Sequence, residues 1–379
     1  MKKRLLCLLL TLVLPLGLTA CNEKPSADTT TAQTASEPTP EPPQPDPAEV
    51  YADSLTLEQQ VAQLFFARCP DVQAAELAAQ YDIGGYILFG RDFENQTPDS
   101  LRETIASYQQ AAATPMLIGV DEEGGTVVRV SAYPAFRAGR FQSPQALFAE
   151  GGLERIQSDT KEKDTLLSSL GINVNLAPVC DVSTSPSDFI NARAFGQDAQ
   201  ATSDYVRTVV EQMQTDGMGM VLKHFPGYGN NVDTHTGIAQ DNRPLEQFRS
   251  SDFLPFTAGI EAGAQAILVC HNIVSCMDGT LPASLSPTVH EVLRDELGFD
   301  GVIMTDDLVM QAITDYTGDA DAAVLAVQAG NDMLISSDFV TQYNAVLAAV
   351  QNGTIRETAI RDSAVRVLRW KIALGLIDS

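Results

Sequence analysis

The chain has 379 residues, of which 49 are acidic and 24 basic, and its formal net charge at pH 7 is −25. This balance excludes a nucleic-acid-binding protein, because phosphate contacts require clustered Lys and Arg. It is typical of a soluble, exported protein and says little about a substrate. The six cysteines form no CxxC pair and no cluster with histidine, so we expect no metal site and no other cofactor.

The first residues have the layout of a secretory signal. A basic start, Met1 to Arg4, precedes an almost purely apolar run over residues 5–18, which is short for a membrane span. The run ends in Leu-Thr-Ala-Cys, which resembles the lipobox of bacterial lipoproteins and implies cleavage after Ala20 and lipidation of Cys21. The alternative is an ordinary cleaved signal in which Cys21 is incidental. We expect export and a lipid anchor on the outer face of the cell membrane.

A tether follows the signal. Residues 21–48 are rich in Pro, Thr, Ser and acidic residues and show no apolar periodicity, so no core can offset the entropy of ordering them. We expect residues 1–20 to be the signal peptide, 21–48 the lipidated tether, and 49–379 one folded domain. About 330 residues are enough for one large barrel or for two ordinary domains.

Short apolar runs alternate with stretches of helical periodicity along this domain. Continuous apolarity is typical of strands that are buried on both faces, as in a parallel sheet. Eight such units predict an α/β protein with a single (β/α)₈ TIM-type barrel, and a doubly wound open sheet is the alternative. The predicted strands are residues 63–68, 84–90, 116–121, 172–181, 218–224, 266–271, 302–306 and 332–336. The clearest helical stretches are residues 101–113, 202–215, 255–262 and 320–329.

Most of the predicted strands end on a polar or charged residue. Barrel enzymes collect their catalytic groups at the carboxyl ends of several strands. Charged groups in a core are costly unless they are paired or bind a ligand, so we expect them to converge on a shared pocket. These residues are Arg68, Asp121, Asp181, Lys223, His224, His271 and Asp306.

Two segments carry candidate catalytic groups. The strand ending in Lys223-His224 continues into a Pro- and Gly-containing loop that reaches Asp233 and His235, and this segment holds two of the four histidines. An aspartate beside a histidine can orient the imidazole and stabilise its charged form; the alternative is a loop stiffened by a local Asp–His hydrogen bond. In the second segment, Asp306 and Asp307 close a buried strand, where consecutive side chains point to opposite sides. Asp306 is the candidate for the pocket, and Asp307 is the candidate for a helix N-cap.

Several ordered blocks resemble the single-domain bacterial β-N-acetylglucosaminidases of glycoside hydrolase family 3, from about Leu55 to the end. The blocks are residues 84–91 (GGYILFGR), 119–125 (GVDEEGG), 175–181 (NLAPVCD), 193–196 (RAFG), 282–286 (PASLS) and 297–301 (LGFDG). The resemblance implies a retaining exo-β-N-acetylglucosaminidase that acts on peptidoglycan fragments or related glycans containing N-acetylglucosamine.

The resemblance also implies a role for each matched residue. Asp306 matches the aspartate that forms the covalent glycosyl-enzyme. His235 matches a histidine acid/base and Asp233 matches its partner. The matched contacts to the terminal sugar are Asp121, Arg129, Arg193, Lys223 and His224.

Three residues depart from the family pattern. Tyr228 and Asn230 stand where a histidine and an aspartate are common in the loop, which puts leaving-group preference in doubt. Thr126 stands where an arginine is usual. Three other functions stay open: a β-glucosidase or xylosidase of the same family, a non-catalytic sugar-binding lipoprotein, and phosphorolysis in place of hydrolysis. Members with glucosidase activity usually carry a further α/β domain that supplies a glutamate acid/base, whereas this chain has the Asp-x-His loop.

Overall fold

The computed structural model describes residues 45–378 apart from 232–236, 238, 315 and 318. Eight parallel strands form one sheet in the order β10-β1-β2-β3-β4-β5-β7-β9. The strands are β1 Phe65–Arg68, β2 Gly85–Leu88, β3 Leu117–Val120, β4 Val174–Asn175, β5 Gly219–Phe225, β7 Ala266–Val269, β9 Val302–Thr305 and β10 Leu334–Ser336.

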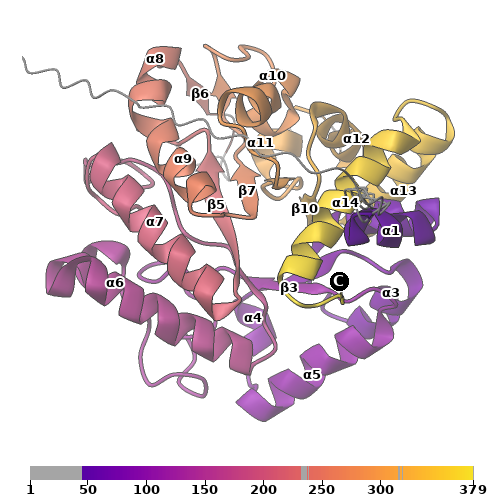
Figure 1. Ribbon diagram of the computed structural model, residues 1–379, viewed down its shortest axis with the longest axis horizontal. Coiled ribbons are helices and arrows are strands. Elements are labelled where there is room, and N and C mark those ends of the chain that lie inside the picture. The colour runs from indigo at the N-terminus through magenta and orange to yellow at the C-terminus, as the bar shows by residue number, and fades with distance from the viewer. Residues whose placement is uncertain (1–44, 232–236, 238, 315, 318, 379) are drawn as a thin grey trace, which may run out of the picture. The chain divides into compact units, whose positions relative to one another are not determined.

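The sheet closes on itself between β9 and β10. The amide of Thr305 donates to the carbonyl of Met333 at 3.2 Å, and Met304 and Met333 form a parallel bridge. An open doubly wound sheet would leave both outer strands without this pairing. The barrel is therefore confirmed, and helices surround it (Figure 1).

Two apolar layers lie on the two sides of the strands, as the two-residue period of a strand requires. Phe66, Ile87 and Leu268 belong to the cluster inside the barrel. Their neighbours Phe65 and Tyr86 belong to the larger cluster beneath the helices. Burial on both sides explains why the strands are continuously apolar in the sequence.

The helices follow the strands in the alternation that the sequence predicts. The four predicted helical stretches correspond to α5, α7, α9 and α12. Local signals set the ends of α7, since Asp198 accepts the amide of Ala201 at 2.9 Å and Gly217 ends the helix with φ of 70°. The helices are α1 Pro47–Ser54, α2 Leu57–Gln63, α3 Ala74–Tyr81, α4 Gly90–Phe93, α5 Pro98–Ala111, α6 Pro144–Ser169, α7 Ala199–Asp216, α8 Leu245–Gln247, α9 Phe253–Glu261, α10 Pro287–Glu291, α11 Gln311–Thr314, α12 Asp319–Ala329, α13 Phe339–Gln351 and α14 Glu357–Ala373.

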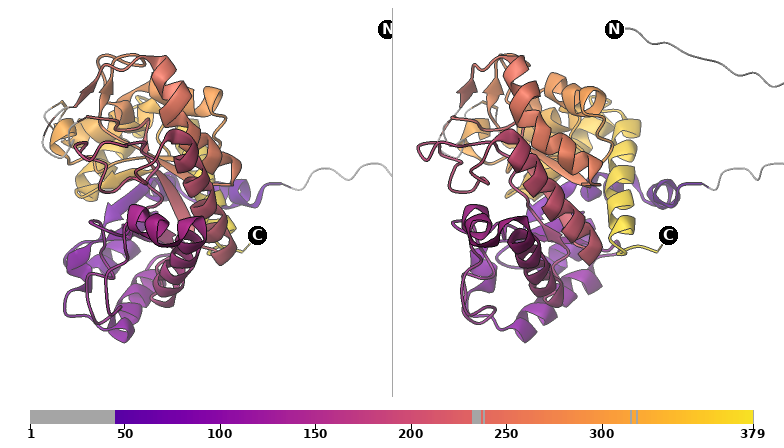
Figure 2. Two further views of the ribbon diagram at one scale, coloured as in Figure 1. Left: turned by 90° about the vertical axis from the view of Figure 1, so that its left-hand side faces the viewer. Right: turned by 60° about the vertical axis from the view of Figure 1, so that its left-hand side comes forward.

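Helix α1 packs against α14, beside which it lies in Figure 2. Arg361 pairs with Asp53 at 2.6 Å, and Arg369 pairs with Asp46. Next to Arg369, the indole of Trp370 donates to the side chain of Gln265, directly before β7, at 2.8 Å. The start of α1 therefore lies near the amino-terminal end of the barrel strands, which we call the barrel floor.

Two short strands lie outside the barrel. β6 (Gln240–Asp241) pairs in parallel with β8 (Ile273–Val274), so this pair joins the segment after β5 to the segment after β7. Both segments follow the carboxyl ends of barrel strands.

The part of the chain that the structure describes contains no helix long and apolar enough to cross a membrane. Its cysteines, Cys69, Cys180, Cys270 and Cys276, are thiols and form no disulfide with one another. Cys180 and Cys270 are fully buried, and burial raises the pKa of each thiol.

Candidate active site

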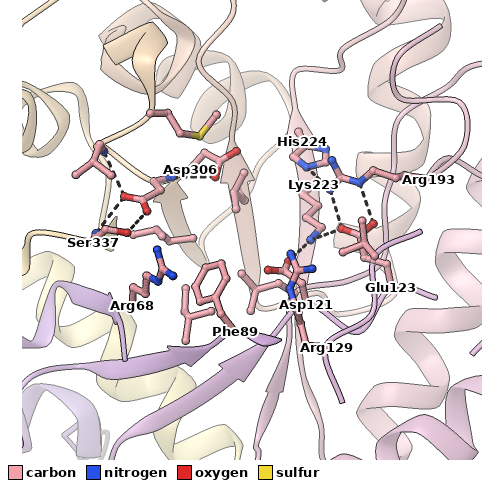
Figure 3. A pocket seen from close by; sticks show the side chains of 18 of the residues that line it. Arg68, Phe89, Asp121, Glu123, Arg129, Arg193, Lys223, His224, Asp306 and Ser337 are labelled. Carbon is pink, nitrogen blue, oxygen red and sulfur yellow. Dashed lines mark hydrogen bonds and ion pairs between the residues drawn. The ribbon is translucent and has the colours of Figure 1, made fainter. Parts of the chain in front are cut away.

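A cavity of about 500 Å³ opens at the carboxyl ends of the barrel strands. The bottom of the cavity is formed by the layer of the barrel interior nearest the carboxyl ends of the strands, where Ile87, Leu176 and Leu268 contribute apolar side chains. Charged side chains from different strands and loops point into it from both sides (Figure 3). The lining residues with acidic, basic or imidazole side chains are Arg68, Asp121, Glu123, Arg129, Arg193, Lys223, His224, Asp306 and Asp307.

A network of buried ion pairs forms one wall of the cavity. The ammonium group of Lys223 lies 2.6 Å from Asp121 Oδ1 and 2.7 Å from Glu123 Oε1. Arg193 donates two hydrogen bonds to Glu123, at 2.9 and 2.7 Å. Lys223 is 2% exposed and Glu123 is 6% exposed, so the network is stable only if each charge keeps its partner.

These charges fix one another's protonation. Burial alone would raise the pKa of Glu123, but the positive charges of Lys223 and Arg193 outweigh it and hold the pKa well below its ordinary value. Burial alone would lower the pKa of Lys223, but Asp121 and Glu123 outweigh it and raise the pKa. Glu123 is therefore an anion and Lys223 a cation near neutral pH.

A second chain of contacts sets the orientation of His224. The guanidinium of Arg193 lies 3.0 Å from Nε2 of His224, and Nδ1 lies 2.8 Å from the buried carboxylate of Asp181. A guanidinium can only donate, so Nε2 accepts and Nδ1 carries the proton that it donates to Asp181. The imidazole is thereby held in one tautomer beside the cavity.

The backbone of β5 explains how the neighbours Lys223 and His224 both line the cavity. On a regular strand their side chains would point to opposite sides. The register between β5 and β7 shifts between Lys223 and Phe225, and such an irregularity re-aims a side chain. The amide of His224 then donates to Asp181 at 3.1 Å.

Asp306 and Asp307, after β9, have different surroundings. Asp306 lines the cavity, and its Oδ1 accepts the amide of Asp307 at 2.8 Å. The carboxylate of Asp307 accepts the amide and hydroxyl of Ser337, after β10, and the amide of Val309 at 3.2 Å. Asp307 thus ties two strand-end loops together. It caps a turn rather than the first turn of a helix, since α11 begins only at Gln311.

The segment after β3 positions three carboxylates alternately. Asp121 and Glu123 face the cavity, whereas the buried Glu122 between them accepts the amides of Arg129 and Val130, both at 2.7 Å. Glu122 therefore folds the loop that carries Arg129 back to the cavity.

The structure brings most of the predicted site residues together. Asp121, Arg129, Arg193, Lys223, His224 and Asp306 all line the one cavity. Asp233 and His235 lie outside the described residues. His271 does not line the cavity. It is buried, and it contacts the hydroxyl of Ser284 at 2.7 Å and the carbonyl of Asp307 at 3.1 Å.

Sequence reasoning missed Glu123, which joins Lys223 to Arg193. Its spacing of two residues from Asp121 on an extended segment was the available signal. Of the residues that depart from the family pattern, Tyr228 lies in the cavity wall, with its ring 5.1 Å from that of His224, whereas Asn230 and Thr126 are exposed.

Residues 56–370 match the family model described as the glycosyl hydrolase family 3 N terminal domain. The chain belongs to glycosyl hydrolase family 3. It is therefore a glycoside hydrolase, which confirms the prediction of an enzyme.

Family 3 relatives resemble the chain in sequence and in structure. A beta-hexosaminidase of Xanthomonas campestris pv. campestris is 34% identical over 276 residues, which are 70% of this chain and 82% of that protein. The structure of a family 3 beta-N-acetylglucosaminidase from Paenibacillus sp. str. FPU-7 has a TM-score of 0.79 and 32% identity, and the match covers 85% of this chain and 63% of that one. A beta-N-acetylhexosaminidase from Beutenbergia cavernae has a TM-score of 0.75 and 29% identity, covering 85% and 99% of the two chains.

Proposed function

We propose that this family 3 enzyme is a retaining exo-β-N-acetylglucosaminidase that removes terminal β-linked N-acetylhexosamine. The observation that carries the proposal is the cavity itself, where a wall of buried donors and acceptors, Lys223, Asp121 and Arg193 among them, shares one space with Asp306. Such a wall suits the hydroxyl groups of one sugar ring. The hexosaminidase and N-acetylglucosaminidase names of the relatives support the sugar class.

The reaction that we infer has two steps. Asp306 attacks the anomeric carbon, the bond from that carbon to the leaving oxygen breaks, and His235 gives its proton to that oxygen. Water then attacks the glycosyl ester, His235 takes a proton from the water, and the Asp306 carboxylate leaves. Asp233 orients the imidazole of His235 and stabilises its charged form.

Histidine suits this acid/base role for two reasons. In the free enzyme an ionised carboxylic acid would place a second negative charge beside the anionic nucleophile, whereas a deprotonated imidazole is neutral. Imidazole also titrates near neutral pH without a large pKa shift.

The surroundings of the two adjacent aspartates support the choice of Asp306 as nucleophile. A nucleophile must reach the anomeric carbon, and both Asp306 and Asp307 line the cavity that would hold the sugar, so the difference between them lies in their other contacts. The Asp307 carboxylate accepts hydrogen bonds from Ser337 and Val309, so its oxygens are engaged in holding loops.

An assay of purified protein on aryl N-acetyl-β-glucosaminide and aryl β-glucoside tests the sugar class. We expect a clear preference in kcat/KM for the N-acetyl sugar, with the β-anomer of the product formed first. Equal or better turnover of the glucoside would favour a family 3 glucosidase. Absence of turnover on both would favour a non-catalytic sugar-binding protein.

We further propose that the enzyme is exported, anchored through Cys21, and acts on peptidoglycan fragments. The signal-like start and the Pro-rich segment before the barrel support the location, and an enzyme on the outer face would meet N-acetylglucosamine in the cell wall. Cys21→Ala should release the protein from the membrane fraction with unchanged specific activity. Continued membrane association of this variant would contradict lipidation at Cys21.

A further inference from the structure

One cation in the cavity has no assigned role. Among the charged lining residues, Lys223 and Arg193 pair with Asp121 and Glu123, and the family resemblance gives Arg129 to the terminal sugar. Arg68 forms no ion pair within the part of the chain that the structure describes, although a guanidinium is always charged. A half-buried cation without a carboxylate partner is costly unless a ligand supplies one.

Arg68 is held in place by packing. It is the last residue of β1, and its guanidinium carbon lies 4.7 Å from the centroid of the Phe89 ring, after β2. Its Nε is buried and finds no hydrogen-bond partner among the described residues. The aromatic ring therefore fixes the guanidinium plane while leaving a donor unsatisfied.

Arg68 also lies where the catalytic cavity meets a second hollow. This hollow, of about 320 Å³, shares Arg68 and Ser337 with the cavity and extends over the loops after β1 and β10. Its lining combines apolar side chains such as Pro70 and Phe339 with the carboxylates of Asp71 and Asp338. Its other arginine, Arg91, is already engaged by the carboxylate of Asp71 and the carbonyl of Cys69.

The wall with Arg68 faces the wall that suits the sugar hydroxyls. Figure 3 shows Arg68 and Ser337 on one side of the cavity, and Lys223, Glu123 and Arg193 on the other. A sugar bound to the second group leaves Arg68 and the hollow for the remainder of the substrate.

We propose that Arg68 and the hollow beside it form a subsite for the part of the substrate beyond the terminal sugar, in which Arg68 binds a carboxylate of that part. The inference rests on the proposed function, because it assumes that the terminal sugar occupies the catalytic cavity. A guanidinium can grip a carboxylate with two parallel hydrogen bonds, and this gives the subsite a preference for an acidic leaving group.

The test compares three substrates. They are N-acetylglucosamine β-1,4-linked to N-acetylmuramic acid, the same disaccharide with its carboxyl group converted to a carboxamide, and a neutral aryl N-acetyl-β-glucosaminide. We expect the wild-type enzyme to favour the acid over the carboxamide by about 10–100-fold in kcat/KM, as for hydrogen bonds to charged groups. Arg68→Gln should abolish this preference, and it should lower kcat/KM for the acid far more than for the carboxamide or the aryl substrate.

Two further variants control the result. Arg68→Lys keeps the positive charge but cannot form two parallel hydrogen bonds to a carboxylate, so we expect an intermediate preference for the acid. This variant replaces Arg68→Gln in the test if Arg68→Gln folds poorly. Arg102→Gln changes an exposed arginine on α5 that pairs with Asp99, and it should keep the full preference.

Three outcomes would overturn the subsite. Equal losses on all three substrates in Arg68→Gln would assign Arg68 to the terminal sugar, and an unchanged preference would remove it from substrate binding. The third outcome is that inorganic phosphate accelerates turnover of the wild type with release of a sugar 1-phosphate. If Arg68→Gln lost this acceleration, Arg68 would bind free phosphate rather than a carboxylate of the substrate. Failure of the wild type on the aryl substrate would instead contradict the proposed function.

Discussion

The buried charges of the cavity depend on Glu123, and Glu123→Gln removes that negative charge while keeping the size of the side chain. In the wild type Glu123 accepts two hydrogen bonds from Arg193 and contacts Lys223 at 2.7 Å. The variant leaves Arg193 without its carboxylate and Lys223 with Asp121 alone. Breaking a buried pair of this kind costs about 3–5 kcal/mol of unfolding free energy. We expect the melting temperature to fall by about 6–10 °C, at roughly 2 °C per kcal/mol for a large domain.

The pH dependence separates the lost charge from lost packing. The folded state holds the pKa of Glu123 below its ordinary value of 4.5, so the stability that it contributes is complete above that pH and is lost as the pH falls toward the folded pKa. The difference between wild type and variant should be constant from pH 7 to about 5. It should shrink by about 1.4 kcal/mol for each pH unit below about 4.5.

Urea unfolding of both proteins at several pH values measures this difference. Glu162→Gln is the matched control, because Glu162 forms an exposed pair with Arg137 and should change stability by less than about 1 kcal/mol. The reasoning is refuted if Glu123→Gln is as stable as the wild type at pH 7. A deficit that does not narrow below pH 4.5 would show that packing, rather than charge, explains the loss.

Three further predictions concern the carboxylates and the acid/base. Asp306→Ala should abolish turnover, whereas Asp307→Asn should only reduce it. A fluorinated slow substrate should label Asp306 covalently in the wild-type enzyme. Covalent label on Asp307 would reverse the assignment of the nucleophile. His235→Ala should lower the rate on a disaccharide by about 10²–10⁴-fold, because a sugar leaving group needs a proton. On a dinitrophenyl glycoside, whose leaving group needs none, the variant should release a burst of dinitrophenolate and then slow down, and azide should restore turnover by attacking the glycosyl-enzyme. Equal losses on both substrates would make the loop a binding element. Burial and the neighbouring Asp216 raise the pKa of Asp164 to about 8, so wild-type stability should fall relative to Asp164→Asn as the pH rises from about 4 to about 8. Parallel unfolding curves across that range would contradict the last prediction.

The barrel could be predicted because each strand is buried on both sides, and this leaves an apolar run that turn residues do not interrupt. The ends of the strands could not be predicted as well. The run over residues 172–181 forms strand β4 only at Val174–Asn175. Pro178 has no amide hydrogen to donate to a ladder. Beyond Asn175 the contact with β5 is irregular: the amide of Val221 donates to the carbonyl of Ala177 at 3.0 Å, and Val179 forms an isolated bridge with Lys223.

The site was predictable where strand geometry determines position. Asp121 and Asp306 directly follow strands and Lys223 lies near the end of β5, and the ends of parallel strands meet at one mouth. Arg193 comes from a long loop after β4, where no periodicity indicates direction, so the resemblance alone pointed to it. His271 also ends a strand but contacts Ser284, which shows that position at a strand end does not decide which way a side chain turns.

The contact between α1 and α14 has a mechanical consequence. The pairs Arg369–Asp46 and Arg361–Asp53 fasten residue 45 and its neighbours close to the barrel floor, whereas the cavity opens at the opposite end of the strands. A force applied at residue 45 would therefore load these two ion pairs and the interface between α1 and α14 before it reached the strand ends that form the cavity.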